Sequence, residues 1–156
     1  MQSSRRRVLQ GTGGLAVMGL AVAAGLVKPG VARAEAWNKA AFESGSVADA
    51  MKAVGAPHPV ESKDIVLNSP DIAENGAVVP FAVESRIPNT QSIALLIEKN
   101  PNVLAADFQI PQGTDPWINT RVKMAQTSRV IALVKADGKY YYNAKEVKVT
   151  LGGCGG

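Results

Sequence analysis

Residues 129–151 read RVIALVKADGKYYYNAKEVKVTL, and this stretch decides the class of fold. Residues 129–135 are apolar enough to form a strand in the middle of a sheet. Asp137-Gly138 follows, and this dipeptide is a two-residue hairpin signal because both residues tolerate a positive φ. Residues 140–142 and 145–151 then supply the aromatic and β-branched side chains that are typical of strands. The stretch therefore predicts strands joined by a tight turn at the end of a β-domain.

Further strand-like segments precede this stretch and are separated by turn residues. We expect strands over residues 60–67, 77–84, 92–98, 103–110 and 117–124, with a turn at 68–71. Pro80 cannot donate a ladder hydrogen bond, so its strand should have an edge or a bulge at that point. About seven or eight short strands with regularly spaced turns predict an all-β fold, an immunoglobulin-like antiparallel β-sandwich. A barrel is the alternative, because periodicity does not separate the two.

A short N-terminal helical segment is expected before the strands. Apolar residues recur at roughly helical spacing over residues 36–54, with a break near Ser44-Gly45-Ser46. Ser46 is suited to cap a second short helix, with Asp49 at its third position. Gly55 should end that helix, and Pro57-His58-Pro59 should enforce an extended linker.

The amino terminus has the pattern of an export signal. Three arginines in Ser4-Arg5-Arg6-Arg7 are followed by an apolar stretch over residues 15–27 and by the small-x-small pattern Ala32-Arg33-Ala34. Paired arginines before a weakly hydrophobic core resemble a twin-arginine (Tat) signal, so we expect cleavage after Ala34 and a periplasmic mature chain. The apolar run is shorter than the ~20 residues of a spanning helix, which argues against a membrane anchor. The absence of a cysteine near the cleavage site argues against a lipoprotein.

The charge of the chain depends strongly on this signal. The whole chain has a net charge of +4, but residues 1–34 contribute five basic residues and no acidic ones. Residues 35–156 hold 12 basic and 13 acidic side chains, which gives no whole-protein argument for nucleic-acid binding. Residues 35–118 carry a net charge of −6 and residues 119–156 a net charge of +5. The basic half favours an anionic cargo or an acidic partner, with solvated strand faces as the alternative.

The only cysteine lies near the end of the chain, within Gly152-Gly153-Cys154-Gly155-Gly156. Glycine visits most backbone conformations, so this segment cannot hold a fixed fold by itself. Three residues separate Leu151 from Cys154, so the thiol can reach roughly 10 Å beyond the domain. A single cysteine in an oxidising compartment indicates either a partner thiol or a functional thiol. The pattern predicts a reactive thiol on a flexible Gly-rich C-terminal arm, and a frayed terminus is the alternative.

These observations predict four parts of the chain. They are a cleaved signal over residues 1–34, a helical segment and linker over 35–58, a β-sandwich over 59–151 and an arm over 152–156. The carboxylate of Gly156 lies two residues from Cys154 and disfavours the thiolate, so a partner's active site would have to activate the thiol. One histidine, His58 in the linker, does not make a metal site or a catalytic triad, and no phosphate-binding loop is present. We therefore expect a covalent carrier without cofactors rather than an enzyme.

Three stretches of the chain carry a specific resemblance. They are the signal over residues 4–10, the segment SPDIAENGAVVP over residues 69–80 and the end VKVTLGGCGG over residues 147–156. Together they resemble the SoxY family, the sulfur-carrier subunits of the periplasmic thiosulfate-oxidising Sox system. The resemblance covers the whole chain.

The resemblance implies roles for residues and partners. It implies that Cys154 is the covalent attachment site for thiosulfate-derived sulfur, on an arm of Gly152, Gly153, Gly155 and Gly156. It implies a heterodimer with a SoxZ-like subunit. The haem enzyme SoxAX would couple thiosulfate to the thiol, the manganese hydrolase SoxB would remove sulfate, and the molybdenum enzyme SoxCD, where present, would oxidise the remaining sulfane sulfur. The competing hypothesis is a secreted structural or interaction protein whose cysteine cross-links two chains, although a glycine arm is a poor structural anchor.

Overall fold

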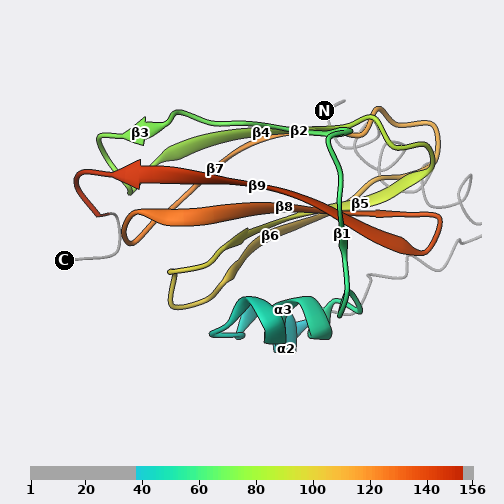
Figure 1. Cartoon of the computed structure of the whole chain (residues 1–156), viewed down its shortest axis with the longest axis horizontal. Coiled ribbons are helices and arrows are strands. Elements are labelled where there is room, and N and C mark those ends of the chain that lie inside the picture. The colour runs from blue at the N-terminus through green and yellow to red at the C-terminus, as the bar shows by residue number, and fades with distance from the viewer. Residues whose placement is uncertain (1–37, 153–156) are drawn as a thin grey trace, which may run out of the picture. The chain divides into compact units, whose positions relative to one another are not determined.

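The computed structural model describes residues 38–152, which form two β-sheets and two short helices (Figure 1). The elements are α2 (Lys39–Phe42), α3 (Val47–Ala53), β1 (Val60–Glu61), β2 (Ile65–Asn68), β3 (Ile72–Ala73), β4 (Val79–Ser85), β5 (Thr90–Ile97), β6 (Leu104–Gln109), β7 (Trp117–Val122), β8 (Ser128–Ala136) and β9 (Lys139–Val149). The larger sheet has the strand order β1-β9-β8-β5-β6, with β3 also paired to β9, and the smaller sheet has the order β2-β4-β7. The expected immunoglobulin-like β-sandwich, preceded by helices, is confirmed.

The larger sheet is buried on both of its faces. One face packs against the smaller sheet, where Ile65 of β2 and Phe81 of β4 are fully buried. The opposite face packs against α2 and α3, whose residues Ala41 and Ala50 are fully buried. Figure 1 shows the same three layers, with the helices below the larger sheet and β2, β4 and β7 above it. This double burial explains why β5 and β8 are apolar at successive positions, in IALLI (93–97) and VIALV (130–134).

The stretch over residues 129–151 forms the hairpin that its sequence predicts. β8 lies between β5 and β9, so the prediction of a central strand is confirmed. Ala136 pairs with Lys139 across a two-residue turn, in which Asp137 and Gly138 have φ values of 49° and 73°. These angles are those of a type I′ turn, which matches the twist of the flanking strands. The two segments predicted after the turn are one strand, because β9 continues without a break over 11 residues.

The second helix, α3, begins and ends where its sequence indicates, and α2 (Lys39–Phe42) covers only part of the helical segment predicted before Ser44. The side chain of Ser46 caps α3 by accepting a hydrogen bond from the backbone N–H of Asp49 at 3.1 Å. Gly55 follows α3 with a φ of 84°, a conformation that glycine adopts without strain. Ala36, at the start of the predicted helical segment, lies outside the described residues.

The predicted strand over residues 60–67 was wrong as a single element. Its first part is β1, which pairs with β9 in the larger sheet, and its second part is β2, which pairs with β4 in the smaller sheet. Between them, the hydroxyl of Ser62 accepts a hydrogen bond from the N–H of Asp64 at 3.2 Å. This local turn takes the chain from one sheet to the other, and hydrophobic periodicity does not detect it.

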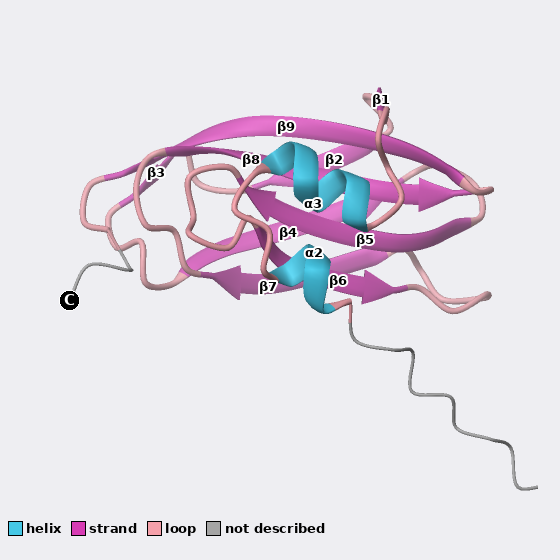
Figure 2. Ribbon diagram, turned by 90° about the horizontal axis from the view of Figure 1, so that it is seen from below, coloured by secondary structure: helices cyan, strands magenta, loops and turns pink. Residues whose placement is uncertain are grey.

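The prediction of a wholly antiparallel sandwich also needs correction. β1 and β3 both pair with β9 in parallel. β3 lies just after residues 68–71, and the sequence pattern did not predict it. Figure 2 shows β9 as a long strand with β3 near the end from which the chain continues towards its C-terminus. A strand of two residues carries too little pattern to be recognised without its partner.

The proline in β4 occupies a local edge. β4 is the middle strand of the smaller sheet, but its pairing with β2 ends at Asn68 opposite Ala82. Pro80 therefore has a neighbour only on the β7 side, where it lies opposite Arg121. The expected edge at Pro80 is confirmed. Proline has no N–H group to donate, and no second strand of the described part of the chain lies beside it at this position.

Candidate functional site

The site predicted from the sequence lies at the end of β9. Gly152 is the last residue that the structure describes, and Gly153, Cys154, Gly155 and Gly156 lie outside the described residues. The structure thus shows the base from which the predicted arm continues. We call residues 149–152 the arm root.

One side of the arm root is held by the chain around β3. The N–H of Thr150 donates to the carbonyl of Ala73 at 3.1 Å, and its hydroxyl donates to the carbonyl of Glu74 at 3.0 Å. One residue pair earlier, the N–H of Lys148 donates to the carbonyl of Asp71 at 2.9 Å. These bonds continue the parallel ladder between β3 and β9 into the arm root.

An ion pair reinforces this ladder. The ammonium group of Lys145 lies 2.8 Å from the carboxylate of Asp71 and donates to the carbonyl of Ser69 at 2.8 Å. The hydrogen bond and the positive charge of Lys145 lower the pKa of the Asp71 carboxyl below its usual value. The ionised pair therefore ties the segment before β3 to β9.

The turn over residues 74–77 contacts the end of the arm root. Its shape is set by Asn75, whose side-chain oxygen accepts a hydrogen bond from the N–H of Ala77 at 2.8 Å. At the centre of the turn, the N–H of buried Gly76 donates to the carbonyl of Leu151 at 2.7 Å. The carbonyl of Gly76 accepts from the N–H of Met124, also at 2.7 Å. Gly76 thus joins three segments that are far apart in the sequence.

The loop between β7 and β8 holds the other side of the arm root. The hydroxyl of Thr127 accepts a hydrogen bond from the N–H of Val149 at 3.0 Å. The side chain of Asn100 fixes the same loop, because it donates to the carbonyl of Lys123 at 2.8 Å and accepts from the N–H of Ala125 at 2.9 Å. The arm root is therefore held between two loops.

Gly152 lies directly against this second loop. A Cβ atom built on Gly152 would collide with the carbonyl oxygen of Ala125 and would lie 3.3 Å from its carbonyl carbon. Because the obstacle is backbone, a rotamer change cannot relieve the collision. Glycine is needed at this position for close approach, and Gly152 packs on the domain that it leaves.

The sequence analysis did not identify the residues that hold the arm root. Asn75 and Gly76 lie in the segment over residues 69–80 that carries the resemblance, but no pattern in the sequence connected them, or Asn100, with the chain end. An asparagine or a glycine in a turn is a general signal. Their connection to the chain end depends on contacts between residues 25 to 76 positions apart.

The basic residues of the carboxyl-terminal half do not all face the arm root. The guanidinium of Arg129 lies 6.0 Å from the centre of the Tyr142 ring, and the ammonium of Lys135 lies 5.7 Å from the centre of the Tyr140 ring. Both rings are partly buried and pack against the core between the helices and the larger sheet. With Lys145 paired to Asp71, three of the seven basic residues have contacts within the domain, which favours the interpretation of solvated strand faces.

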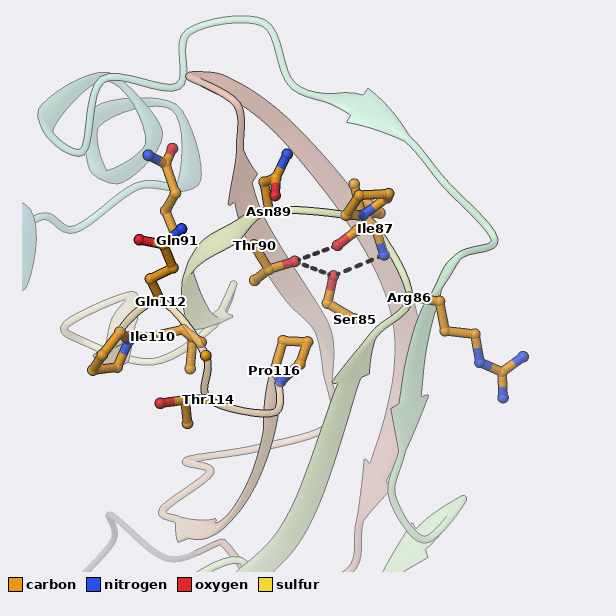
Figure 3. A pocket seen from close by; sticks show the side chains of 13 residues that line it. Ser85, Arg86, Ile87, Asn89, Thr90, Gln91, Ile110, Gln112, Thr114 and Pro116 are labelled. Atoms are coloured by element: carbon orange, nitrogen blue, oxygen red, sulfur yellow. Dashed lines mark hydrogen bonds between the residues drawn. The ribbon is translucent and has the colours of Figure 1, made fainter.

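A pocket of about 520 Å³ lies at the opposite end of β9 from the arm root (Figure 3). It is lined by the loops over residues 85–91 and 110–116. The hydroxyls of Ser85 and Thr90 bond each other at 2.7 Å, and Thr90 donates to the carbonyl of Ile87 at 2.8 Å. These hydroxyls therefore serve the loop itself. The length of β9 separates the pocket from the arm root by ~33 Å, which is beyond the reach of the terminal thiol.

The described residues offer few other candidates for a catalytic or metal-binding site. His58 is exposed in the linker, as predicted. Within residues 38–152, no group of three or more histidine, cysteine, aspartate or glutamate side chains is placed to hold a metal ion. In the same part of the chain, no helix has the length and apolar character needed to cross a membrane. Among the described residues, the arm root is therefore the part of the structure that bears on the predicted carrier thiol.

Comparisons with known proteins identify the family. A family model described as "Sulfur oxidation protein SoxY" matches residues 50–154. Among solved structures, the chain is similar to the sulfur carrier protein SoxY from Chlorobium limicola f thiosulfatophilum. The identity is 35%, the TM-score is 0.62, and the match covers 72% of this chain and 99% of that chain.

Other comparisons add nothing to this assignment. A chain from a structural study of T cell specificity and activation by the bacterial superantigen toxic shock syndrome toxin-1 has 13% identity and a TM-score of 0.39. That match covers 55% of this chain and 98% of the other, and it supports no argument. A search of curated proteins found no significant match. The family model covers more than half of the sequence, and the chain belongs to the SoxY family of sulfur oxidation proteins.

Proposed function

We propose that this sulfur carrier holds thiosulfate-derived sulfur covalently on Cys154 and presents it to the Sox enzymes in the periplasm. The observation that carries the proposal is the position of the only cysteine, two residues beyond a glycine that packs on the domain. The packing of Gly152 supports a thiol that emerges at a defined point on the domain. The remaining glycines keep the chain around the thiol slender, which suits entry into a narrow active site.

The loading step is an oxidation of the thiol. The Cys154 sulfur forms a bond to the outer sulfur of thiosulfate, the S–H bond breaks, and one proton and two electrons are released. A haem enzyme of the SoxAX type accepts the two electrons. Since the protein supplies no base beside the thiol in sequence, the enzyme's site must favour the thiolate. The chain is thus a covalent substrate of its partner enzymes and not itself the catalyst.

Later steps act on the group that Cys154 carries. A SoxB-type hydrolase would release sulfate by adding water across the terminal sulfur–sulfonate bond. This leaves a sulfane sulfur on the cysteine for a SoxCD-type enzyme where one is present. We propose a SoxZ-like subunit as the permanent partner. The division into a cleaved signal (1–34), a helical segment and linker (35–58), a sandwich (59–151) and an arm (152–156) belongs to this proposal.

The test is the mass of the mature protein after exposure to thiosulfate and the haem enzyme. We expect the wild type to gain one thiosulfate group, and we expect Cys154→Ser to gain none, because a serine oxygen cannot form the sulfur–sulfur bond. Folding of the variant should be unchanged, since the side chain lies beyond the sandwich. The hypothesis of a cross-linking protein predicts the opposite pattern. In that case the wild type would form disulfide-linked dimers on a non-reducing gel and would take up no thiosulfate.

A further inference from the structure

Exposed apolar side chains gather on the segments that meet at the arm root. Among residues 38–152, the large hydrophobic side chains that are exposed are Val60, Ile72, Val78, Trp117 and Leu151. Single exposed apolar residues are normal on any protein surface. Here, however, Ile72, Val78 and Leu151 all lie on the arm root or on the segment over residues 71–78 that bonds to it. Their position, rather than their number, requires an explanation.

Hydrogen bonds limit how far apart Val78 and Leu151 can lie. Leu151 bonds directly to Gly76, and Val78 follows Gly76 by two residues. Two trans peptide units span at most ~7.6 Å between Cα atoms. Val78 therefore lies close to the point at Gly152 where the chain leaves the domain, which we call the exit. Ile72 is more distant, because it pairs with Lys148, three strand positions before Leu151. Val78 and Leu151 therefore border the exit, and Ile72 lies at its periphery.

The short distance from the exit to the thiol restricts any enzyme that receives it. Gly152 packs against Ala125, and Cys154 is only two residues further along the chain. The Cα atom of Cys154 thus lies within ~7.6 Å of that of Gly152. An active site that encloses the thiol has to bring its entrance against the surface around the arm root. The side chains on that surface must then contact the enzyme.

We propose that Val78 and Leu151, with Ile72 at the periphery, form the surface on which the thiosulfate-coupling enzyme docks, and that the entrance of its active site is apolar. The inference rests on the proposed function of Cys154. The residues at positions 153–156 are three glycines and the cysteine, which offer little side-chain area to cover this surface. A few apolar side chains around the exit give a small contact, which suits a carrier that must leave each enzyme after it reacts.

The matched experiment compares Val78→Ser with Val60→Ser. The two valines are similarly exposed, at 56% and 60%, but Val60 lies in β1, which pairs with β9 near its first residues, far from the arm root. The mature carrier, with its partner subunit, is titrated against the haem enzyme in the presence of thiosulfate. We expect Val78→Ser and Leu151→Ser to raise the KM for the carrier roughly tenfold, Ile72→Ser to have a smaller effect, and Val60→Ser to have none. The kcat at saturating carrier and the rate of Cys154 alkylation by iodoacetamide should stay at wild-type values.

The outcomes separate this inference from the proposed function. If the wild type takes up no thiosulfate group, the proposed function fails and the docking surface fails with it. If the wild type is loaded and Val78→Ser has the same KM as Val60→Ser, only the docking surface is overturned. If Val78→Ser instead removes a self-association of the wild type in size-exclusion chromatography and leaves the KM unchanged, the surface belongs to a second copy of this chain and the inference is wrong. Altered alkylation in Val78→Ser would also overturn it, because the effect would then arise in the arm.

Discussion

Gly152 and Gly138 show that glycines in this chain serve different physical purposes. Gly138 adopts a φ of 73° in the turn between β8 and β9, a conformation that few residues other than glycine, asparagine and aspartate adopt without strain. Gly152 is needed for a different reason, because any Cβ at that position collides with the backbone of Ala125. The first requirement is local and can be recognised from Asp137-Gly138 alone. The second depends on a loop that is more than 20 residues away in the sequence.

Replacing Gly152 with alanine should release the arm root from the domain. The added methyl group cannot share space with the Ala125 carbonyl, so the chain end must move, and the Gly76 N–H loses its bond to Leu151. We expect hydrogen exchange at the Gly76 amide to become roughly two- to tenfold faster, which corresponds to the loss of one ordinary hydrogen bond. Gly153→Ala is the control and should leave this exchange rate unchanged. Equal exchange rates in the two variants would contradict a specific packing role for Gly152.

At the scale of elements, β9 organises the sandwich. It pairs with β8 along its length, with β1 near its start and with β3 near its end. Both parallel partners are two residues long, so neither is stable without side-chain contacts that hold it in place. For β3, these contacts are the burial of Ala73 in the core and the ion pair between Lys145 and Asp71. The position of the turn over residues 74–77, and hence of the arm root, depends on this attachment.

The Asp71–Lys145 attachment should weaken in acid. Because Lys145 lowers the pKa of Asp71 in the folded protein, the ionised carboxylate stabilises the fold above the usual carboxyl pKa. That contribution is lost as the pH falls below ~4 through the lowered pKa. A double-mutant cycle of Asp71→Asn and Lys145→Met, measured by thermal unfolding, should show a coupling at neutral pH that decreases as the pH is lowered below ~4. Since the carboxylate is exposed, added salt should also reduce the coupling. A coupling that is independent of pH would show that the ion pair does not attach β3.

At the scale of the whole molecule, the two ends of the sandwich differ in structure. The end with the arm root gathers the chain end, the turn over residues 74–77 and the loop after β7. The other end holds the hairpin turn and the pocket of Figure 3, which the terminal thiol cannot reach. Under the proposed function, the end with the arm root faces the Sox enzymes. The remaining surface is then left for the proposed SoxZ-like subunit.

The predicted amino-terminal Tat signal can be tested by following export of the whole precursor. Tat recognition depends on paired arginines, so replacing Arg5 and Arg6 with lysine should leave the precursor in the cytoplasm. The wild type should appear in the periplasm with Glu35 as its first residue, which intact mass or Edman sequencing detects. Normal export of the double variant would rule out a Tat signal. Processing at another residue would move the boundary between the signal and the mature chain.

The sequence by itself determined the central strands β5 and β8 and the hairpin turn after β8, because double burial leaves successive apolar residues in β5 and β8 and the tight turn leaves Asp137-Gly138. It also determined where the single thiol lies along the chain. The capping of α3 by Ser46 followed from the same kind of local chemistry. Each of these features is set by neighbours in sequence, so pattern and residue type were sufficient to predict them.

Only the tertiary structure decided how the chain end is held. Thr150 bonds to Glu74 across 76 positions, Val149 bonds to Thr127 across 22, and Asn100 bonds to Ala125 across 25. β3 is a strand only through its pairing with β9. β1 and β2 are separate strands because β1 pairs with β9 in the larger sheet and β2 pairs with β4 in the smaller sheet. Each of the hydrogen bonds made by Thr150, Thr127 and Asn100 joins one polar side chain to a backbone group of a distant segment. The backbone partner leaves no signal in the sequence, since every residue supplies a C=O group and every residue except proline supplies an N–H group.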